Sequence, residues 1–188
     1  GFDALELTGN VNGVISSIER IIVNATDDAI NPDQIVVTLN GATSDMEVSI
    51  TNDGVTTTQT YFQPPVTPTV TLEVNGFSGD DIVVIDHRNG FVDADVVLNG
   101  GAGADSLQVI DAGSTASNLT ALYVPGDSTD NGTVLLTEGG FTQTVTFSGL
   151  TPVEFTGIAQ ATLQTPRSSD DVTLAAAIGP ISGLNALE

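Results

Sequence analysis

Residues 70–86 read VTLEVNGFSGDDIVVID, and residues 94–111 read ADVVLNGGAGADSLQVID. Both stretches begin with alternating apolar residues and continue with Asn-Gly, a glycine-rich turn that ends in Asp, and a second alternating apolar run. The glycines of the two Asn-Gly pairs, Gly76 and Gly100, are 24 residues apart (100 − 76 = 24). A repeat of this length predicts an array in which each turn of the chain stacks on the one before.

The alternation also predicts which side chains form the core. In a strand every second side chain points to the same face, so the apolar members of both runs should point inward and stack on their counterparts. The expected pairs are Leu72 with Val96, Val74 with Leu98, Val83 with Leu107, and Ile85 with Val109.

The glycine-rich turns predict a metal site. Residues 100–108, GGAGADSLQ, match the calcium-binding nonapeptide G-G-x-G-x-D-x-U-x at every fixed position, and residues 76–84 match except for Phe77 at the second glycine. Ca²⁺ takes six to eight oxygen ligands, and glycine lets the backbone turn its carbonyls inward. The alternative is that the glycines only make tight turns, which the aspartates cap through Asx hydrogen bonds. The predicted metal-site residues are Gly76, Gly79, Asp80, Asp81, Gly100, Gly101, Gly103 and Asp105, with Asp86 and Asp111 as further candidates.

These turns resemble those of two groups of calcium-associated repeat proteins. The sequence GGAGAD is similar to the secreted RTX-type repeats, and the wider pattern resembles still more the long β-strand-repeat proteins of bacterial surfaces. RTX nonapeptides run in direct tandem, whereas these copies are 24 residues apart, so the resemblance implies a wider solenoid turn with a similar metal loop. It also implies an exported protein, extracellular or at the cell surface, built from neighbouring modules or copies of itself.

The segments around the central repeat show related patterns. Residues 34–51, QIVVTLNGATSDMEVSIT, follow the same order of strand, Asn-Gly, Asp45 and strand, but the turn lacks the inner glycine, so we expect no strong metal site there. Residues 52–68 contain three prolines, which are excluded from central strands, and are expected to form a hairpin or a lateral flap off the solenoid. Residues 141–157 predict two strands on either side of Gly149, and residues 12–20 are a weak candidate for a short helical segment.

A longer repeat suggests the domain organisation. Val172-Thr173-Leu174 follows Asp170-Asp171 much as Ile35-Val36-Val37 follows Asp33, with an offset of about 137 residues (172 − 35 = 137). We therefore expect one module over residues 1–174, and the start of a next module, a linker or a tag over residues 175–188.

Composition limits the partners. The chain has 188 residues, a formal net charge of −21 at pH 7, three arginines and no lysine. Phosphate contacts need a basic surface, so we expect no nucleic-acid partner, and no apolar run is long enough to insert into a membrane. Cations are the natural partners, although a solvated acidic surface would give the same composition. The absence of cysteine excludes disulfides and thiolate metal sites.

Enzymatic and sugar-binding functions are the alternatives to a structural one. His87 and Arg88 follow Asp86 and could serve as an acid–base pair in a polysaccharide lyase or hydrolase on a β-helix, but we expect a solvated loop with a local Asp86 ion pair. A lyase must neutralise the substrate's carboxylates with cationic groups, which this chain scarcely has. We therefore expect no enzyme. Tyr61, Phe62 and Phe77 are candidates for a platform that stacks on surface glycans, as in a carbohydrate-binding module.

Together these features predict an all-β fold, namely a right-handed parallel β-solenoid (β-helix) with a lateral proline-rich flap. The alternative fold is an antiparallel β-sandwich of immunoglobulin or cadherin type, which also binds calcium at acidic loops. The expected function is that of a calcium-stabilised structural module in an adhesin stalk, a surface layer or an extracellular fibre.

Overall fold

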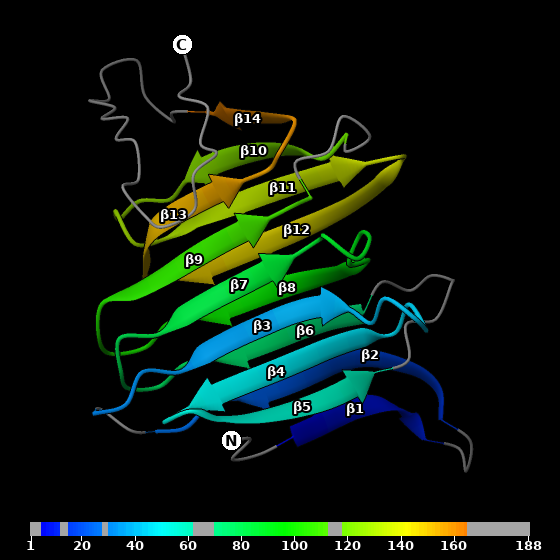
Figure 1. The fold of residues 1–188 in the computed structure, drawn as a ribbon, viewed down its shortest axis with the longest axis vertical. Coiled ribbons are helices and arrows are strands. Elements are labelled where there is room, and N and C mark those ends of the chain that lie inside the picture. The colour runs from blue at the N-terminus through cyan, green and yellow to red at the C-terminus, as the bar shows by residue number, and fades with distance from the viewer. Residues whose placement is uncertain (1–4, 12–14, 28–29, 62–69, 113–117, 165–188) are drawn as a thin grey trace.

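The computed structural model describes residues 5–11, 15–27, 30–61, 70–112 and 118–164. This part of the chain is all β, in two mixed sheets that face each other and do not close on themselves (Figure 1). No helix in the described residues is long and apolar enough to cross a membrane. The predicted boundary at residues 174 and 175 lies outside the described residues.

One sheet has eight strands and the other has six. In spatial order the first sheet consists of β1 (Leu5–Val11), β2 (Ile15–Asn24), β6 (Val70–Asn75), β8 (Ala94–Asn99), β12 (Phe141–Ser148), β11 (Gly132–Glu138), β10 (Thr120–Pro125) and β14 (Gln160–Leu163). The second consists of β13 (Leu150–Thr156), β9 (Asp105–Ile110), β7 (Ile82–Asp86), β3 (Gln34–Leu39), β4 (Met46–Asn52) and β5 (Val55–Tyr61).

The chain passes repeatedly from the eight-stranded sheet to the six-stranded one. The four crossings are β2 to β3, β6 to β7, β8 to β9, and β12 to β13. The strands that begin these crossings are parallel neighbours in one sheet, and the strands that end them are parallel neighbours in the other. Each crossing therefore lies directly beside the previous one.

The predicted 24-residue register is confirmed. Leu72 pairs with Val96 and Val74 with Leu98 between β6 and β8, and the same offset relates β7 to β9. All eight side chains of the four predicted pairs are at most 2% exposed. Alternation in the sequence thus placed the central core correctly, because each strand has one face toward the opposite sheet.

The expectation that residues 34–51 repeat this pattern is confirmed for the apolar residues and wrong for the turn. Val37 and Val48 are buried, but β3 and β4 form an antiparallel hairpin within one sheet. The Asn40 side-chain oxygen accepts hydrogen bonds from the N–H groups of Ala42 and Thr43. This bonding closes the turn on itself, so the chain reverses instead of crossing to the other sheet.

Two further expectations can be compared with the structure. Within residues 52–68, residues 55–61 form β5, which makes a hairpin with β4 at the edge of the six-stranded sheet, in line with the hairpin alternative, and residues 62–69 lie outside the described residues. Residues 15–20, within the helical candidate, belong to β2. By contrast, the two strands predicted around Gly149 are present as β12 and β13.

Candidate metal site at the stacked glycine turns

The crossings at the start of β3, β7 and β9 stack at one end of the two sheets. The backbone N–H of Ala25 donates to the Asn75 carbonyl, that of Gly76 to the Asn99 carbonyl, and that of Gly100 to the Ser148 carbonyl, at 2.8–2.9 Å. These equivalent bonds continue the strand ladders into the turns. The two predicted metal loops are therefore neighbours in space and in register.

The glycines at these turns are required by the close approach of neighbouring backbone. A Cβ atom placed on Gly76 would lie 2.3 Å from the Gly100 carbonyl oxygen, and one on Gly100 would lie 2.4 Å from the Gly149 oxygen. Gly103 has a φ of 148°, and a Cβ there would lie 1.7 Å from the Gly79 oxygen. The glycine pattern thus has a steric cause that holds with or without a metal.

Amide side chains form a ladder along the same edge. Asn75 donates through Nδ2 to Oδ1 of Asn24 at 2.9 Å, and Asn99 donates in the same way to Asn75 at 2.8 Å. The Ser148 hydroxyl donates to Oδ1 of Asn99 at 3.0 Å and ends the ladder. Sequence reasoning assigned Asn75 and Asn99 to tight turns and did not connect Asn24 with them. The missed signal was that all three asparagines end a strand that precedes a crossing.

Removing the middle of this ladder should affect two hydrogen bonds at once. Asn75→Ala leaves Asn99 without its acceptor and Asn24 without its donor, and we expect a loss of about 1 kcal/mol in the free energy of unfolding. Because both substitutions break the Asn75–Asn99 bond, the double variant with Asn99→Ala should lose less than the two single losses added together. Denaturant unfolding of the three variants measures this coupling, and strictly additive losses would contradict the ladder.

Three aspartates form a buried column next to the amide ladder. Asp33, Asp81 and Asp105 are each 1% exposed. The backbone N–H of Asp33 donates to Oδ1 of Asp81 at 2.8 Å, and the N–H of Asp81 donates to Oδ1 of Asp105 at 2.8 Å. Each of these two carboxylates thus holds the preceding rung in place. These bonds differ from the Asx caps considered from sequence, since they join separate rungs instead of closing one turn.

Each carboxylate in this column keeps one oxygen that has no hydrogen-bond partner within the described residues. These buried oxygens are Oδ1 of Asp33, Oδ2 of Asp81 and Oδ2 of Asp105. Burial raises the pKa of Asp81 to about 6 against the opposing bond from the Asp33 N–H, and the Asp105, Asp33 and Asp80 carboxylates raise it further. Burial likewise raises the pKa of Asp105. The column is therefore a place where a proton or a cation would relieve unfavourable charge.

The other predicted ligands are distributed differently. Asp80 is exposed and accepts a hydrogen bond from the Ala104 N–H at 2.9 Å. Asp86 and Asp111 follow the apolar runs of β7 and β9, at the opposite ends of the strands from Asp81 and Asp105. Within the described ranges no three His, Asp or Glu side chains form a group that could hold a metal ion. A cation at the column would therefore need backbone carbonyls or water in addition to the carboxylates.

The predicted solvated loop at His87 is wrong for the histidine and right for its neighbour. His87 is 2% exposed; its Nδ1 accepts a hydrogen bond from the Val92 N–H, and its ring packs 5.1 Å from that of Phe91. Burial lowers the pKa of His87 to about 4. Arg88 makes the expected ion pair with Asp86, at 2.6 Å. Phe91 and Val92 turn the loop back over the imidazole, which the local sequence did not reveal.

The aromatic platform expected from sequence is not formed as a set of exposed rings. Tyr61 is 7% exposed and belongs to the core, whereas Phe77 is 42% exposed at the β6–β7 turn. Phe62 lies outside the described residues. Tyr61 is the last residue of β5 and pairs with the buried Met46 of β4, which is consistent with its place in the core.

Comparison of the chain with family models, with curated proteins and with solved structures gives no match. Inference about function therefore rests on the stacked turns and on the surfaces that the two sheets present.

Proposed function

We propose that the chain is a structural module of a repetitive exported protein, wound as a parallel β-solenoid and stabilised by Ca²⁺ at the stacked glycine turns. The observation that carries this proposal is the column of three buried aspartates, each with an unpartnered oxygen, two of which, Asp81 and Asp105, lie at turns that resemble a calcium-binding pattern. A hard cation with oxygen ligands suits such a column better than an uncompensated set of charges does.

The proposed winding follows from the four crossings. A chain that enters one sheet, crosses, and returns beside its previous path describes a coil, and β6 to β9 do so with constant register. The hairpins β4–β5 and β10–β11 are then insertions that extend the sheets in plane. A sandwich has the same two layers. The strands that begin the four crossings are parallel neighbours, as are the strands that end them, and this pairing favours the coil.

A structural role also suits the side chains that were candidates for other functions. A general base must reach the proton that it abstracts, and His87 is buried with its Nδ1 already occupied by the Val92 N–H. Stacking on a glycan needs exposed rings, and Tyr61 is buried. The net charge of −21 favours a setting with abundant cations, such as the extracellular space or the cell surface.

Calcium should raise the thermal stability of the protein, and the effect should depend on Asp105. A ligand that binds only the folded state adds RT ln(1 + [L]/Kd) to stability. With a Kd of about 0.1–1 mM, common for extracellular modules, millimolar calcium adds about 1 kcal/mol per site and raises Tm by a few degrees. Melting curves with calcium and with EDTA measure the difference.

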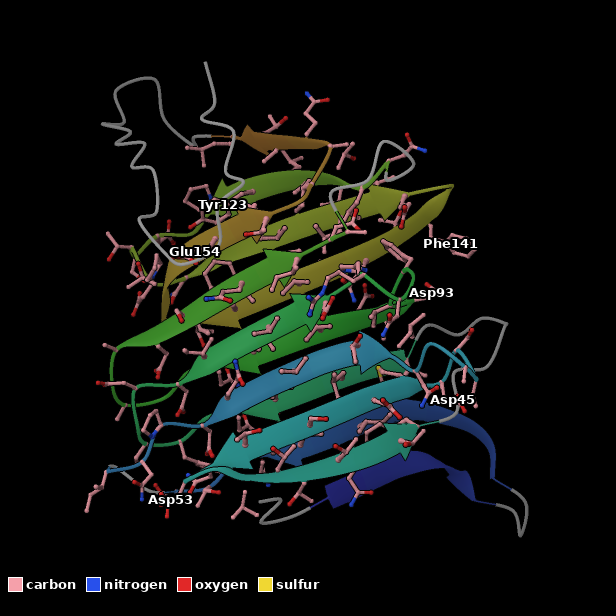
Figure 2. All side chains as sticks on the ribbon, in the orientation of Figure 1. Asp45, Asp53, Asp93, Tyr123, Phe141 and Glu154 are labelled. Carbon is pink, nitrogen blue, oxygen red and sulfur yellow. The ribbon has the colours of Figure 1, made fainter. Side chains whose placement is uncertain are left out.

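Two variants show whether the effect belongs to the column. Asp105→Asn keeps the shape of the side chain, so the calcium response should disappear while stability in EDTA is kept or increased. Asp45→Asn is the matched control, because Asp45 lies in the β3–β4 turn at the other end of the sheets (Figure 2), and its calcium response should be unchanged. Identical curves with calcium and EDTA in the unmutated protein would refute calcium stabilisation and leave the glycines as purely steric features.

A further inference from the structure

The Asn-Gly pairs of the chain differ in the surroundings of the glycine nitrogen. In such a pair the asparagine readily loses its side-chain amide, because glycine has no side chain to hinder attack of its backbone nitrogen on the asparagine Cγ. The sequence has six pairs, of which the one at residues 12–13 lies outside the described residues; the others begin at Asn40, Asn75, Asn89, Asn99 and Asn131. A nitrogen that is hydrogen-bonded or crowded cannot attack, so the fold decides which pair reacts.

The two pairs at the stacked turns are protected by the bonds that hold the stack together. The Gly76 N–H donates to the Asn99 carbonyl at 2.8 Å, and the Gly100 N–H donates to the Ser148 carbonyl at 2.9 Å. The asparagine of each pair is held as well, by the amide ladder. Both sets of hydrogen bonds must open before either glycine nitrogen can reach its asparagine side chain.

Two further pairs are protected in other ways. The Gly90 N–H donates to the His87 carbonyl at 3.0 Å. Gly132 is buried at the start of β11, and a Cβ placed on it would lie 2.8 Å from the rings of Tyr123 and Phe147. A ring that closes on the Gly132 nitrogen would need space that these aromatic side chains already fill.

The Asn40-Gly41 pair in the β3–β4 turn has an open nitrogen. Gly41 is exposed, and its N–H has no hydrogen-bond partner among the described residues. The Asn40 Oδ1 accepts from the N–H groups of Ala42 at 2.9 Å and Thr43 at 3.2 Å, so the amide folds forward over Gly41. The same two donors would stabilise the negative charge that develops on this oxygen when the nitrogen attacks.

We propose that Asn40 is a deamidation site of the folded protein and that its conversion to aspartate weakens the β3–β4 hairpin. The Gly41 nitrogen forms a bond to the Asn40 Cγ, the Cγ–Nδ2 bond breaks, and the proton from the Gly41 nitrogen leaves with the amide as ammonia. Water then opens the cyclic imide at either carbonyl and gives aspartate or its β-linked isomer. Water is the only co-reactant, and the chain gains one negative charge.

The loss of the amide acts on the hairpin through Glu47. The Asn40 Nδ2 donates to the Glu47 Oε1 at 2.8 Å. A carboxylate in the place of this amide has no hydrogen to donate, and it puts two like charges side by side. The β-linked isomer also lengthens the main chain beside the bond from the Asn40 N–H to the Asp45 carbonyl. As the protein ages, this hairpin therefore loosens before the stacked turns do, whether or not calcium is bound.

Peptide mass mapping of the full chain, incubated in mildly alkaline buffer with EDTA, tests the site. In the folded protein, Asn40 should deamidate at least about tenfold faster than Asn75, a difference of about 1.4 kcal/mol in activation free energy. In urea the two rates should become similar. Gly41→Ala is the matched variant, because its Cβ would contact only the Asn89 side chain, at 3.7 Å, and it should slow the reaction at Asn40 alone. Equal rates in the folded protein, the same ranking in urea, or no effect of Gly41→Ala would overturn the proposal.

Asn40→Asp reproduces the normally linked product and tests the consequence for the hairpin. Its side-chain oxygen can still accept from Ala42 and Thr43, so a lower Tm at neutral pH would report the contact with Glu47. Adding Glu47→Gln supplies a donor again, and most of the lost Tm should return; Glu47→Gln alone is the reference. An unchanged Tm in Asn40→Asp, or a loss that Glu47→Gln does not relieve, would show that deamidation leaves the hairpin intact or acts by another route, and the proposal would be wrong. Melts in EDTA keep this readout separate from the calcium response.

Discussion

Gly103→Ala is expected to lower the free energy of unfolding by about 2–5 kcal/mol. Its Cβ would lie 1.7 Å from the Gly79 carbonyl oxygen, a backbone atom of the neighbouring turn that cannot move without disturbing the stack. Forcing extra volume into a packed site costs about 1–3 kcal/mol, and a positive φ adds roughly 1–2 kcal/mol for a residue with a side chain. Denaturant unfolding measures the loss.

Gly54→Ala separates the two contributions. Gly54 has a φ of 74°, and a Cβ there would have nothing within 4 Å, so only the conformational cost of about 1–2 kcal/mol applies. The difference between the two variants therefore reports the close approach of the stacked turns. Equal losses would show that the turns at Gly79 and Gly103 are not in contact in solution.

The second large effect is a loss of folding stability at acid pH that arises from His87. In the unfolded chain His87 has an ordinary pKa of 6.5, and in the folded protein burial lowers it to about 4. Its stabilising contribution is therefore complete above pH 6.5 and is lost as the pH falls through 4, since the unfolded chain binds the proton more readily. At 1.36 kcal/mol per pKa unit, about 2–3 kcal/mol should disappear between pH 7 and pH 4.5.

Asp81 opposes this loss in calcium-free buffer. Its folded pKa of about 6 lies above the ordinary value of 3.8, so the folded protein binds the proton more readily and gains about 2 kcal/mol over the same pH interval. The unmutated protein should then show a shallow net change. His87→Gln should become relatively more stable in acid, and Asp81→Asn relatively less stable. Unfolding at pH 7 and pH 4.5 compares them, and parallel profiles for both variants would contradict the assignment.

Sequence pattern predicted most of the central fold because alternation and turn spacing both act locally. Val74 and Leu98 could be paired from the sequence alone, since one face of each strand must be apolar. The hairpin after Leu39 could not, because the same Asn-Gly pair begins both a reversal and a crossing. What separates them is the bonding of Asn40 to its own turn, which depends on side-chain geometry.

The candidate site was predicted in part. The turn pattern identified Asp81 and Asp105, which the structure places in one buried column. It missed Asp33, because the β2–β3 crossing lacks the glycine pattern, and it included Asp86 and Asp111, which lie at the other ends of their strands. His87 was misplaced because its burial arises from folding of the following loop over the ring. Such long-range covering leaves no periodic signal in the chain.

The amide ladder also has a kinetic consequence. Its central hydrogen bond joins residues 24 apart, whereas the flanking bonds close segments of 51 and 49 residues. Loop-closure entropy grows with the logarithm of length, so each flanking contact costs about 0.6 kcal/mol more to form from the open chain. Rates of folding follow the sequence separation of contacts. The segment from β6 to β9 should thus be the nucleus, on which the terminal strands and both hairpins are added outward.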